Sequence, residues 1–258
     1  MFKHIQIGIS TYIASFSFIH KHKLYSLFLI PGLLSLLLLS VGIYLIFSLS
    51  MNLSDYILNN LNLNDLPIWA LSLIKITLGI IIRLISFLTL CVVFRYLILI
   101  VLSPVLSFIV QKIEYIQGYK EQSFSFTQIL KDVIRAIKIT LSNSVIQIGL
   151  IVLLSLLSFI PVIGYICLVI IFIIECYYLG FSLLDYTLEV KNYNVKETRV
   201  FLKKHRTLAM TNGIFFYAWL IIPIFGWMIG PIIGTIAANI SVNKILRENE
   251  SSQALSNS

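Results

Sequence analysis

Long apolar runs separated by short polar stretches are the dominant pattern along this chain. Residues 24–50 are 27 consecutive uncharged residues, and a second run from 67 to about 117 is too long for one bilayer crossing. Strict alternation of apolar and polar positions, which would indicate β-strands, is absent. Apolar runs of about 20 residues or more predict membrane-spanning helices, because a helix satisfies its own backbone hydrogen bonds in lipid.

Two further apolar runs are each interrupted by a Pro-x-x-Gly unit. The runs are residues 139–174 and 207–243, and the units are Pro161 to Gly164 and Pro223 to Gly226. Proline ends a helix and glycine permits a tight reversal, so each unit predicts a helical hairpin. The halves of the second run, 16 and 17 residues, span roughly 24 to 26 Å as helices, against a hydrocarbon core of about 30 Å. The predicted fold is an all-α integral membrane protein with two long transmembrane helices and two Pro-x-x-Gly helical hairpins. The short halves of the second hairpin predict that it penetrates the bilayer only in part.

A charged amphipathic stretch precedes the first hairpin. In residues 126–141 the apolar side chains recur at helical spacing along one stripe. The charged residues on the other faces are Lys131, Asp132, Arg135 and Lys138. This pattern predicts a helix that lies in the cytoplasmic interface or leads into the membrane. Further along, Asn194 and Glu197 have the spacing of a capping box and predict the start of a short basic helix.

Composition supports the membrane assignment. Of the 258 residues, 59% are hydrophobic and 12% are charged, whereas soluble domains carry about 25% charged residues. The net charge of +8 comes from basic residues between the apolar runs, which indicates positive cytoplasmic loops and argues against a nucleic-acid partner. The loop over residues 51–67 contains no Lys or Arg and is therefore predicted to lie outside. We predict one membrane domain over residues 1–247, a disordered cytoplasmic tail over residues 248–258, and both termini in the cytoplasm.

No arrangement of residues in the sequence supports enzyme chemistry. The four histidines lie in basic stretches, and no Gly-rich phosphate loop, nucleophile elbow or His-Glu-x-x-His pattern occurs. The three cysteines, Cys91, Cys167 and Cys176, all lie in apolar runs, which is typical of buried thiols. We therefore predict no catalytic residues, no metal site and no cofactor.

Ionisable residues inside the apolar runs are the sharpest candidates for a functional site. Lys75, Arg83 and Arg95 are the cations, and Glu175 and Asp185 are the anions. Intramembrane ionisable residues are costly, so they mark transport paths or form structural ion pairs, and the sequence leaves both readings open. Ten residues separate Glu175 from the Pro-x-x-Gly turn, and we expect Arg83 or Arg95 to be its partner.

Small residues recur every four positions after the second turn. They are Gly226, Gly230, Gly234 and Ala238, with Pro231 among them. Such a stripe forms a smooth groove that another helix backbone can approach closely. Packing is favoured over a direct substrate role for these glycines. Beside them Thr235, Asn239 and Asn243 form a polar stripe that either bonds to a neighbouring helix or lines water.

Four stretches of the chain resemble the CysZ family of bacterial sulfate permeases and the related etoposide-induced-protein family. They are "SPVLSFIVQKIEYIQG" (103–118), "FIPVIGYI" (159–166), "LGFSLLDYTLEVKNYNVKETRVFLKKHR" (179–206) and "NGIFFYAWLIIPIFGWMIGPIIGTIAAN" (212–239). The likeness covers about the last 160 residues, whereas the N-terminal half agrees only in hydropathy. It implies two long transmembrane helices, partly inserted hairpins, an oligomeric assembly in the bacterial inner membrane, and sulfate entry.

The chain departs from that family pattern at two places. The family's paired arginines, six and five residues before the proline of the first span, correspond to Tyr25 and Ser26, with Lys21 and Lys23 one turn earlier. The family's Glu-x-x-Glu after the Ser-Pro element corresponds to Gln111 and Glu114. The first departure weakens the assignment of sulfate more than it weakens the assignment of the fold.

The functional hypothesis is a permease or channel for a small inorganic anion, with sulfate for sulfur assimilation as the leading candidate. Lys21 and Lys23 would attract the anion at the cytoplasmic mouth, Arg83 and Arg95 would bind it at depth, and Glu114, Glu175 and Asp185 would pair or gate. The expected partners are membrane lipid, the anion and further copies of the chain. The alternative is a membrane scaffold or interaction protein that transports nothing.

Overall fold

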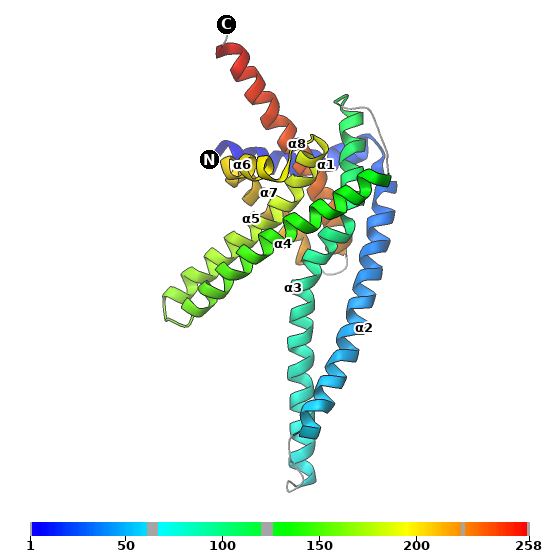
Figure 1. The fold of residues 1–258 in the computed structure, drawn as a ribbon, viewed down its shortest axis with the longest axis vertical. Coiled ribbons are helices and arrows are strands. Elements are labelled where there is room, and N and C mark those ends of the chain that lie inside the picture. Colours follow the sequence, from blue (N-terminus) through cyan, green and yellow to red (C-terminus); the bar gives the residue numbers. More distant parts are fainter. Residues whose placement is uncertain (1, 61–66, 120–125, 223–224, 257–258) are drawn as a thin grey trace. The chain divides into compact units, whose positions relative to one another are not determined.

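Helices make up the regular structure throughout the residues described. The computed structural model describes residues 2–60, 67–119, 126–222 and 225–256, and no strand occurs within them. The elements are α1 (Phe2–Lys21), the 3₁₀ helix η1 (Leu24–Phe28), α2 (Leu29–Asn60), α3 (Ile68–Ile116), α4 (Phe126–Leu157), α5 (Ile163–Val190), α6 (Val195–Lys204), α7 (Arg206–Leu220) and α8 (Phe225–Ser256) (Figure 1). Six segments of the described residues are long and apolar enough to cross a membrane. The prediction of an all-α, multi-pass membrane protein is confirmed.

The chain divides into two compact units, and the single membrane domain stays a prediction. One unit is Leu34–Ile98, and the other combines Met1–Leu33 with Leu99–Ser258. In the first unit, α2 and the leading half of α3 are apolar on nearly every face, with many exposed leucines and isoleucines. We expect such a surface to face lipid, because exposing this apolar area to water is unfavourable.

Two glycines allow α5 and α7 to cross at backbone contact in the second unit. A Cβ atom added to Gly180 would overlap the carbonyl oxygen of Ala209, and one added to Gly213 would overlap the carbonyl oxygen of Cys176. Three residues that are near these glycines in the sequence are fully buried, namely Leu183, Leu184 and Phe216. The crossing therefore brings two helix backbones into direct contact, and the sequence pattern identified neither glycine.

Helix α1 is a further element that the sequence analysis missed. Its buried face packs on α7 and α8, where Tyr12 donates a hydrogen bond to the Asn212 carbonyl (3.0 Å) and Thr11 bonds Ser241 (2.7 Å). Outside this buried face, Ile13 and Phe16 are exposed. Apolar residues on both faces separated by small polar ones blur the amphipathic signal of a single stripe, which explains why this helix was overlooked.

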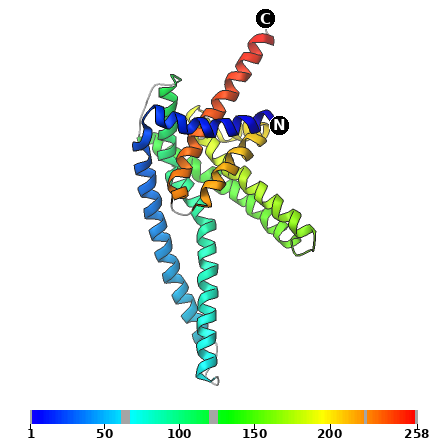
Figure 2. The same cartoon turned by 180° about the vertical axis from the view of Figure 1, so that it is seen from behind.

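Both Pro-x-x-Gly units coincide with a break between helices. The chain turns between Leu157 and Ile163, and α4 and α5 run side by side on either side of this turn, with their common tip extending away from α1, α7 and α8 (Figures 1 and 2). A Cβ at Gly164 would collide with the carbonyl of Ser158, and one at Gly226 with the carbonyl of Trp219. The glycine of each unit is thus required for close approach. Pro223 lies outside the described residues.

Two segments are longer helices than the sequence suggested. The amphipathic stretch and the first apolar half form one continuous helix, α4. Helix α8 continues to Ser256, although residues 248–258 were predicted to be a disordered tail. The segment contains no Gly or Pro between Glu248 and Ser256, so nothing in its residue types terminates the helix that precedes it. Pro104 lies inside α3, which is unbroken over 49 residues.

Candidate functional site

A buried carboxylate at the end of α3 is the centre of the first polar cluster. Glu114 is 1% exposed, and its Oε2 atom accepts a hydrogen bond from Lys191 Nζ at 2.9 Å. Its Oε1 atom accepts from the side-chain amides of Asn239 at 2.6 Å and Asn243 at 2.7 Å. One cation and two amide donors therefore neutralise this charge, which is how a protein retains an ion in a low-dielectric interior.

An aromatic ring joins this cluster to the basic end of α8. Lys191 Nζ and the guanidinium of Arg247 each lie 5.0 Å from the centroid of the Tyr119 ring. Both distances are within the range of a cation–π contact. A cavity of about 610 Å³ beside the ring is lined by residues that include Asn243, Lys244 and Arg247. The buried Glu114 cluster thus adjoins a basic cavity.

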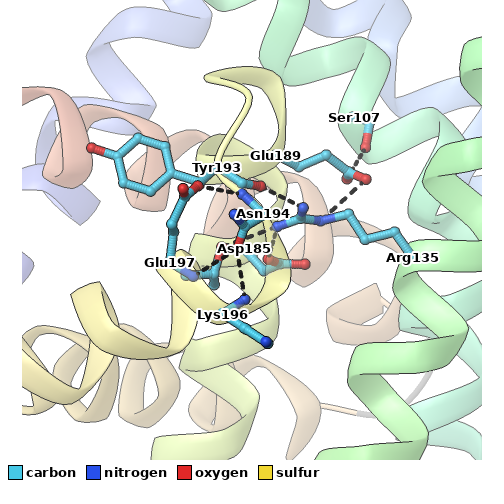
Figure 3. A network of polar contacts seen from close by, with 9 residues as sticks. Ser107, Arg135, Asp185, Glu189, Tyr193, Asn194, Lys196 and Glu197 are labelled. Carbon is cyan, nitrogen blue, oxygen red and sulfur yellow. Dashed lines mark hydrogen bonds and ion pairs between the residues drawn. The ribbon is translucent and has the colours of Figure 1, made fainter.

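Arg135 is the centre of the second cluster, which Figure 3 shows from close by. Its Nη2 atom donates to Asp185 Oδ1 at 2.7 Å and to Thr198 Oγ1 at 3.0 Å, and its Nη1 atom donates to the Tyr193 carbonyl at 2.5 Å. The Nε atom lies 3.4 Å from Glu189 Oε1. One guanidinium from α4 therefore holds α5, α6 and the turn between them.

Local sequence explains how each partner reaches Arg135. Asp185 and Glu189 are four residues apart on α5, so their carboxylates project from the same face of the helix. Glu189 Oε2 also accepts a hydrogen bond from Ser107 of α3 at 3.2 Å. The α6 start is fixed by Asn194, whose side chain accepts the backbone N–H of Glu197 while Glu197 caps Asn194 in return. This predicted capping box is confirmed.

A pair of histidines joins α1 to the junction of α6 and α7. His4 Nε2 and His205 Nδ1 are 3.4 Å apart, and His205 is 5% exposed. Burial, together with the nearby charges of His4 and Lys204, lowers the pKa of His205 from 6.5 to about 4. Burial and the positive charges of the N-terminus and Lys3 also lower the pKa of His4. The pair is therefore neutral at pH 7.

Acidification is expected to destabilise the fold through His205. The pKa of His205 is lower in the folded state, so the unfolded chain takes up a proton first as the pH falls. The contribution of the neutral His205 side chain to folding stability is therefore complete above pH 6.5 and is lost as the pH falls towards 4. The loss amounts to at most about 3 kcal/mol at the acid end. Thermal unfolding in detergent between pH 7.5 and 4.5 should show a smaller drop in Tm for His205→Gln than for the parent chain. His20→Gln, at an exposed histidine, is the control, and equal drops for all three proteins would contradict the assignment.

The structure describes the side chains of four of the five predicted cations. Arg83 lines a cavity of about 340 Å³ between α2 and α3, whose other lining residues are apolar apart from Ser50. Lys75 is exposed on α3, and the side chain of Arg95 lies outside the described residues. Lys21 ends α1, and Lys23 precedes η1 in a left-handed conformation with φ of 50°. Both lysines are exposed.

The positions of the family's paired arginines also lie in this turn. Tyr25 and Ser26 are exposed within η1, and the Tyr25 hydroxyl is 2.7 Å from His20 Nδ1. The basic groups in this part of the chain are therefore contributed by the residues just before η1.

The predicted anions fall into two groups. Glu114 and Asp185 are both buried and paired with cations, Lys191 and Arg135 respectively. Glu175 is half-buried on α5. Its pairing with Arg83 or Arg95 stays a prediction, because those two residues belong to the other compact unit.

The glycine stripe of α8 lies against three other helices. A Cβ at Gly230 would approach Trp219 of α7 to 2.8 Å, and one at Gly234 would approach Leu183 of α5 to 2.8 Å and the Tyr12 hydroxyl of α1 to 3.2 Å. Pro231 is inside the helix, and Ala238 is fully buried. The glycines therefore pack closely against neighbouring helices. The adjoining Asn239 and Asn243 donate hydrogen bonds to Glu114.

Sequence reasoning missed the cations that complete both clusters. Arg135 was treated as part of the polar face of an amphipathic helix, and Lys191 as part of a basic loop. The detectable signal was the pair of acids at Asp185 and Glu189, because two carboxylates on one helical face near an apolar segment require a cation. Nothing in the one-dimensional pattern identifies which of the many basic residues supplies it.

Comparison with known proteins agrees with this architecture. The family model described as sulfate transporter CysZ/etoposide-induced protein 2.4 matches residues 12–231. A search of curated proteins finds no match. The matched range includes the buried acids, Arg135, Lys191 and both Pro-x-x-Gly units. The chain therefore belongs to the sulfate transporter CysZ/etoposide-induced protein 2.4 family.

Proposed function

We propose that this protein is a permease or channel that carries a small inorganic anion across a bacterial inner membrane, with sulfate as the leading substrate. Family membership supports transport as the activity. The observation that carries the proposal is the position of Arg83, which lies in the candidate span Ile68–Phe87 and lines an otherwise apolar cavity between α2 and α3. A cation at such depth is costly unless it faces water, protein or an anion.

The buried acids support a path for anions rather than for cations. Glu114 and Asp185, which lie in candidate spans, are each paired with a cation. Their charge is therefore not free to attract a metal ion. Arg83, in contrast, is exposed in the isolated chain and offers a planar set of donors that suits tetrahedral oxyanions.

Assembly of several copies would resolve the cost of exposing Arg83 to lipid. An arginine at the centre of a bilayer costs about 2.5 to 3.5 kcal/mol even on insertion scales. Further copies of the chain placed around the α2 and α3 faces would cover this side chain and enclose a polar path. We therefore propose a homo-oligomer, with both termini in the cytoplasm and Lys21 and Lys23 at the entrance on that side.

Removal of the Arg83 charge is expected to abolish most sulfate flux. Loss of a charge-assisted hydrogen bond of about 1.5 to 3 kcal/mol corresponds to a decrease of roughly 10- to 100-fold. The measurement is uptake of radiolabelled sulfate by liposomes that contain the purified protein, comparing Arg83→Ala with the parent chain. Arg83→Lys keeps the charge and should retain part of the flux, and Lys203→Ala, at an exposed position of α6, should retain all of it.

The same assay separates transport from the alternative scaffold function. If liposomes with the parent protein take up no more sulfate than empty liposomes, the transport proposal fails and a scaffold is favoured. If the parent chain conducts and Arg83→Ala conducts equally, transport stands and the role of Arg83 is wrong. Growth of a sulfate-uptake mutant that expresses the chain provides an independent measurement in cells.

A further inference from the structure

A second basic cavity lies beside α4 and shares no lining residue with the α2–α3 cavity. Its volume is about 480 Å³, and its lining includes Lys131, Arg135, Lys138 and Glu189 together with residues 192–195 of the turn before α6. Arg135 is committed to internal hydrogen bonds with Asp185, Thr198 and the Tyr193 carbonyl. Lys131 and Lys138 are exposed, and among the described residues no acid forms an ion pair with either of them. Two ammonium groups are thus available to a ligand.

The two lysines share a helical face with a long apolar stripe. Lys131 and Lys138 are seven residues apart, which places them two turns and about 10 Å from each other on one side of α4. The same face continues with Leu141 (58% exposed), Val145 (72%), Val152 (53%) and Leu156 (64%). This part of α4 approaches the hairpin tip, which extends away from α1, α7 and α8 (Figures 1 and 2). The stripe is therefore left exposed by the part of the chain that the structure describes.

The boundary between charge and apolar stripe coincides with the start of a membrane span. The candidate span in α4 is Ile137–Leu157, so Lys131 precedes it and Lys138 is its second residue. A lysine so close to the span's end extends its ammonium group to the interface. The stripe from Leu141 to Leu156 covers roughly 22 Å along the helix. One leaflet of the hydrocarbon core is about 15 Å thick, so the stripe is long enough to contact an acyl chain over the whole leaflet.

We propose that this face of α4 binds an anionic phospholipid. The phosphate occupies the cavity and accepts hydrogen bonds from Lys131 and Lys138, while an acyl chain lies along Leu141, Val145 and Val152. A free oxyanion would satisfy the two lysines but would leave the adjoining stripe uncovered; charge and apolar length together select the lipid. The site goes beyond the proposed transport activity and uses none of the residues assigned to it.

The test measures lipid binding to the full-length protein in detergent. Phosphatidylglycerol and phosphatidylcholine with the same acyl chains are titrated separately, and bound lipid is counted by native mass spectrometry. Each lysine near an anionic surface contributes about 1 kcal/mol, so Lys131→Gln/Lys138→Gln is expected to bind phosphatidylglycerol about 30-fold more weakly. The control Lys203→Gln/Lys204→Gln removes the same charge from exposed positions of α6 and should bind like the parent.

Three results would overturn the proposal. The first is equal binding of phosphatidylglycerol by the parent and the Lys131→Gln/Lys138→Gln protein. The second is an equal loss in the α6 control, which would indicate non-specific attraction. The third is displacement of bound phosphatidylglycerol by inorganic sulfate or glycerol phosphate at equal concentration, because a ligand without acyl chains should compete poorly. Circular dichroism of each variant checks that the helices are retained.

Discussion

Alanine at Gly213 is expected to destabilise the protein strongly, because α5 and α7 cross there at backbone contact. The new Cβ atom would overlap the carbonyl oxygen of Cys176, and the same change at Gly180 would overlap the carbonyl of Ala209. Both obstacles are backbone atoms, so α5 and α7 must separate rather than rotate a side chain. Overpacking of this kind costs about 1 to 3 kcal/mol, and occasionally more. The measurement is thermal unfolding of the purified variants in detergent.

Glycines that face open space provide the matched control for that experiment. A Cβ added to Gly79 or Gly149 meets no atom within 4 Å. Alanine at a helix interior is favoured over glycine by about 0.5 to 1 kcal/mol, so Gly149→Ala should leave Tm unchanged or raise it. The close crossing would be contradicted if Gly213→Ala and Gly149→Ala unfolded at the same temperature.

Replacing Arg135 by methionine is expected to give the second large loss of stability. The change leaves the Asp185 and Glu189 carboxylates buried without the guanidinium that now contacts both. Removal of one member of a buried ion pair costs about 3 to 5 kcal/mol, because the remaining charge is uncompensated. Urea or thermal unfolding, followed by circular dichroism, measures this loss.

A solvent-exposed ion pair separates the effect of burial from the effect of charge. Lys3 and Glu248 are 2.9 Å apart with side chains 68% and 36% exposed, and Lys3→Met should cost less than about 1 kcal/mol. The triple variant Arg135→Met/Asp185→Asn/Glu189→Gln removes the stranded charges and should recover part of the stability. If Arg135→Met costs no more than Lys3→Met, the buried cluster does not stabilise the fold as described.

The fold was largely predictable because bilayer thickness and helix geometry constrain it strongly. Apolar runs of a length set by the membrane predicted an all-α, multi-pass protein, which the structure confirms, and the turn predicted at Pro161 separates α4 from α5. Helix α1 was not predicted, because its apolar residues lie on two faces. A glycine that contacts another helix looks like any other glycine in the sequence. The crossing at Gly180 and Gly213 is therefore visible only in the three-dimensional structure.

The candidate site was predictable only in part. Asp185 was identified because ionisable residues are rare inside apolar runs, and Glu114 because it matches the second acid of the family's Glu-x-x-Glu. The amides at Asn239 and Asn243 were identified because they repeat at helical spacing. Arg135 and Lys191 were not, since basic residues are common at membrane boundaries, where most need no acidic partner. The sequence shows which charges are costly, and the three-dimensional fold decides which opposite charges relieve that cost.

The contacts of Arg135 also have a mechanical consequence for the hairpin of α4 and α5. The guanidinium joins α4 to α5 through Asp185 and to α6 through Thr198, and Arg199 of α6 donates a second link to Ser142 of α4 at 2.6 Å. These three helices cannot tilt independently while the contacts persist. These contacts couple the hairpin to α6, so a displacement of the hairpin is expected to change the orientation of α6.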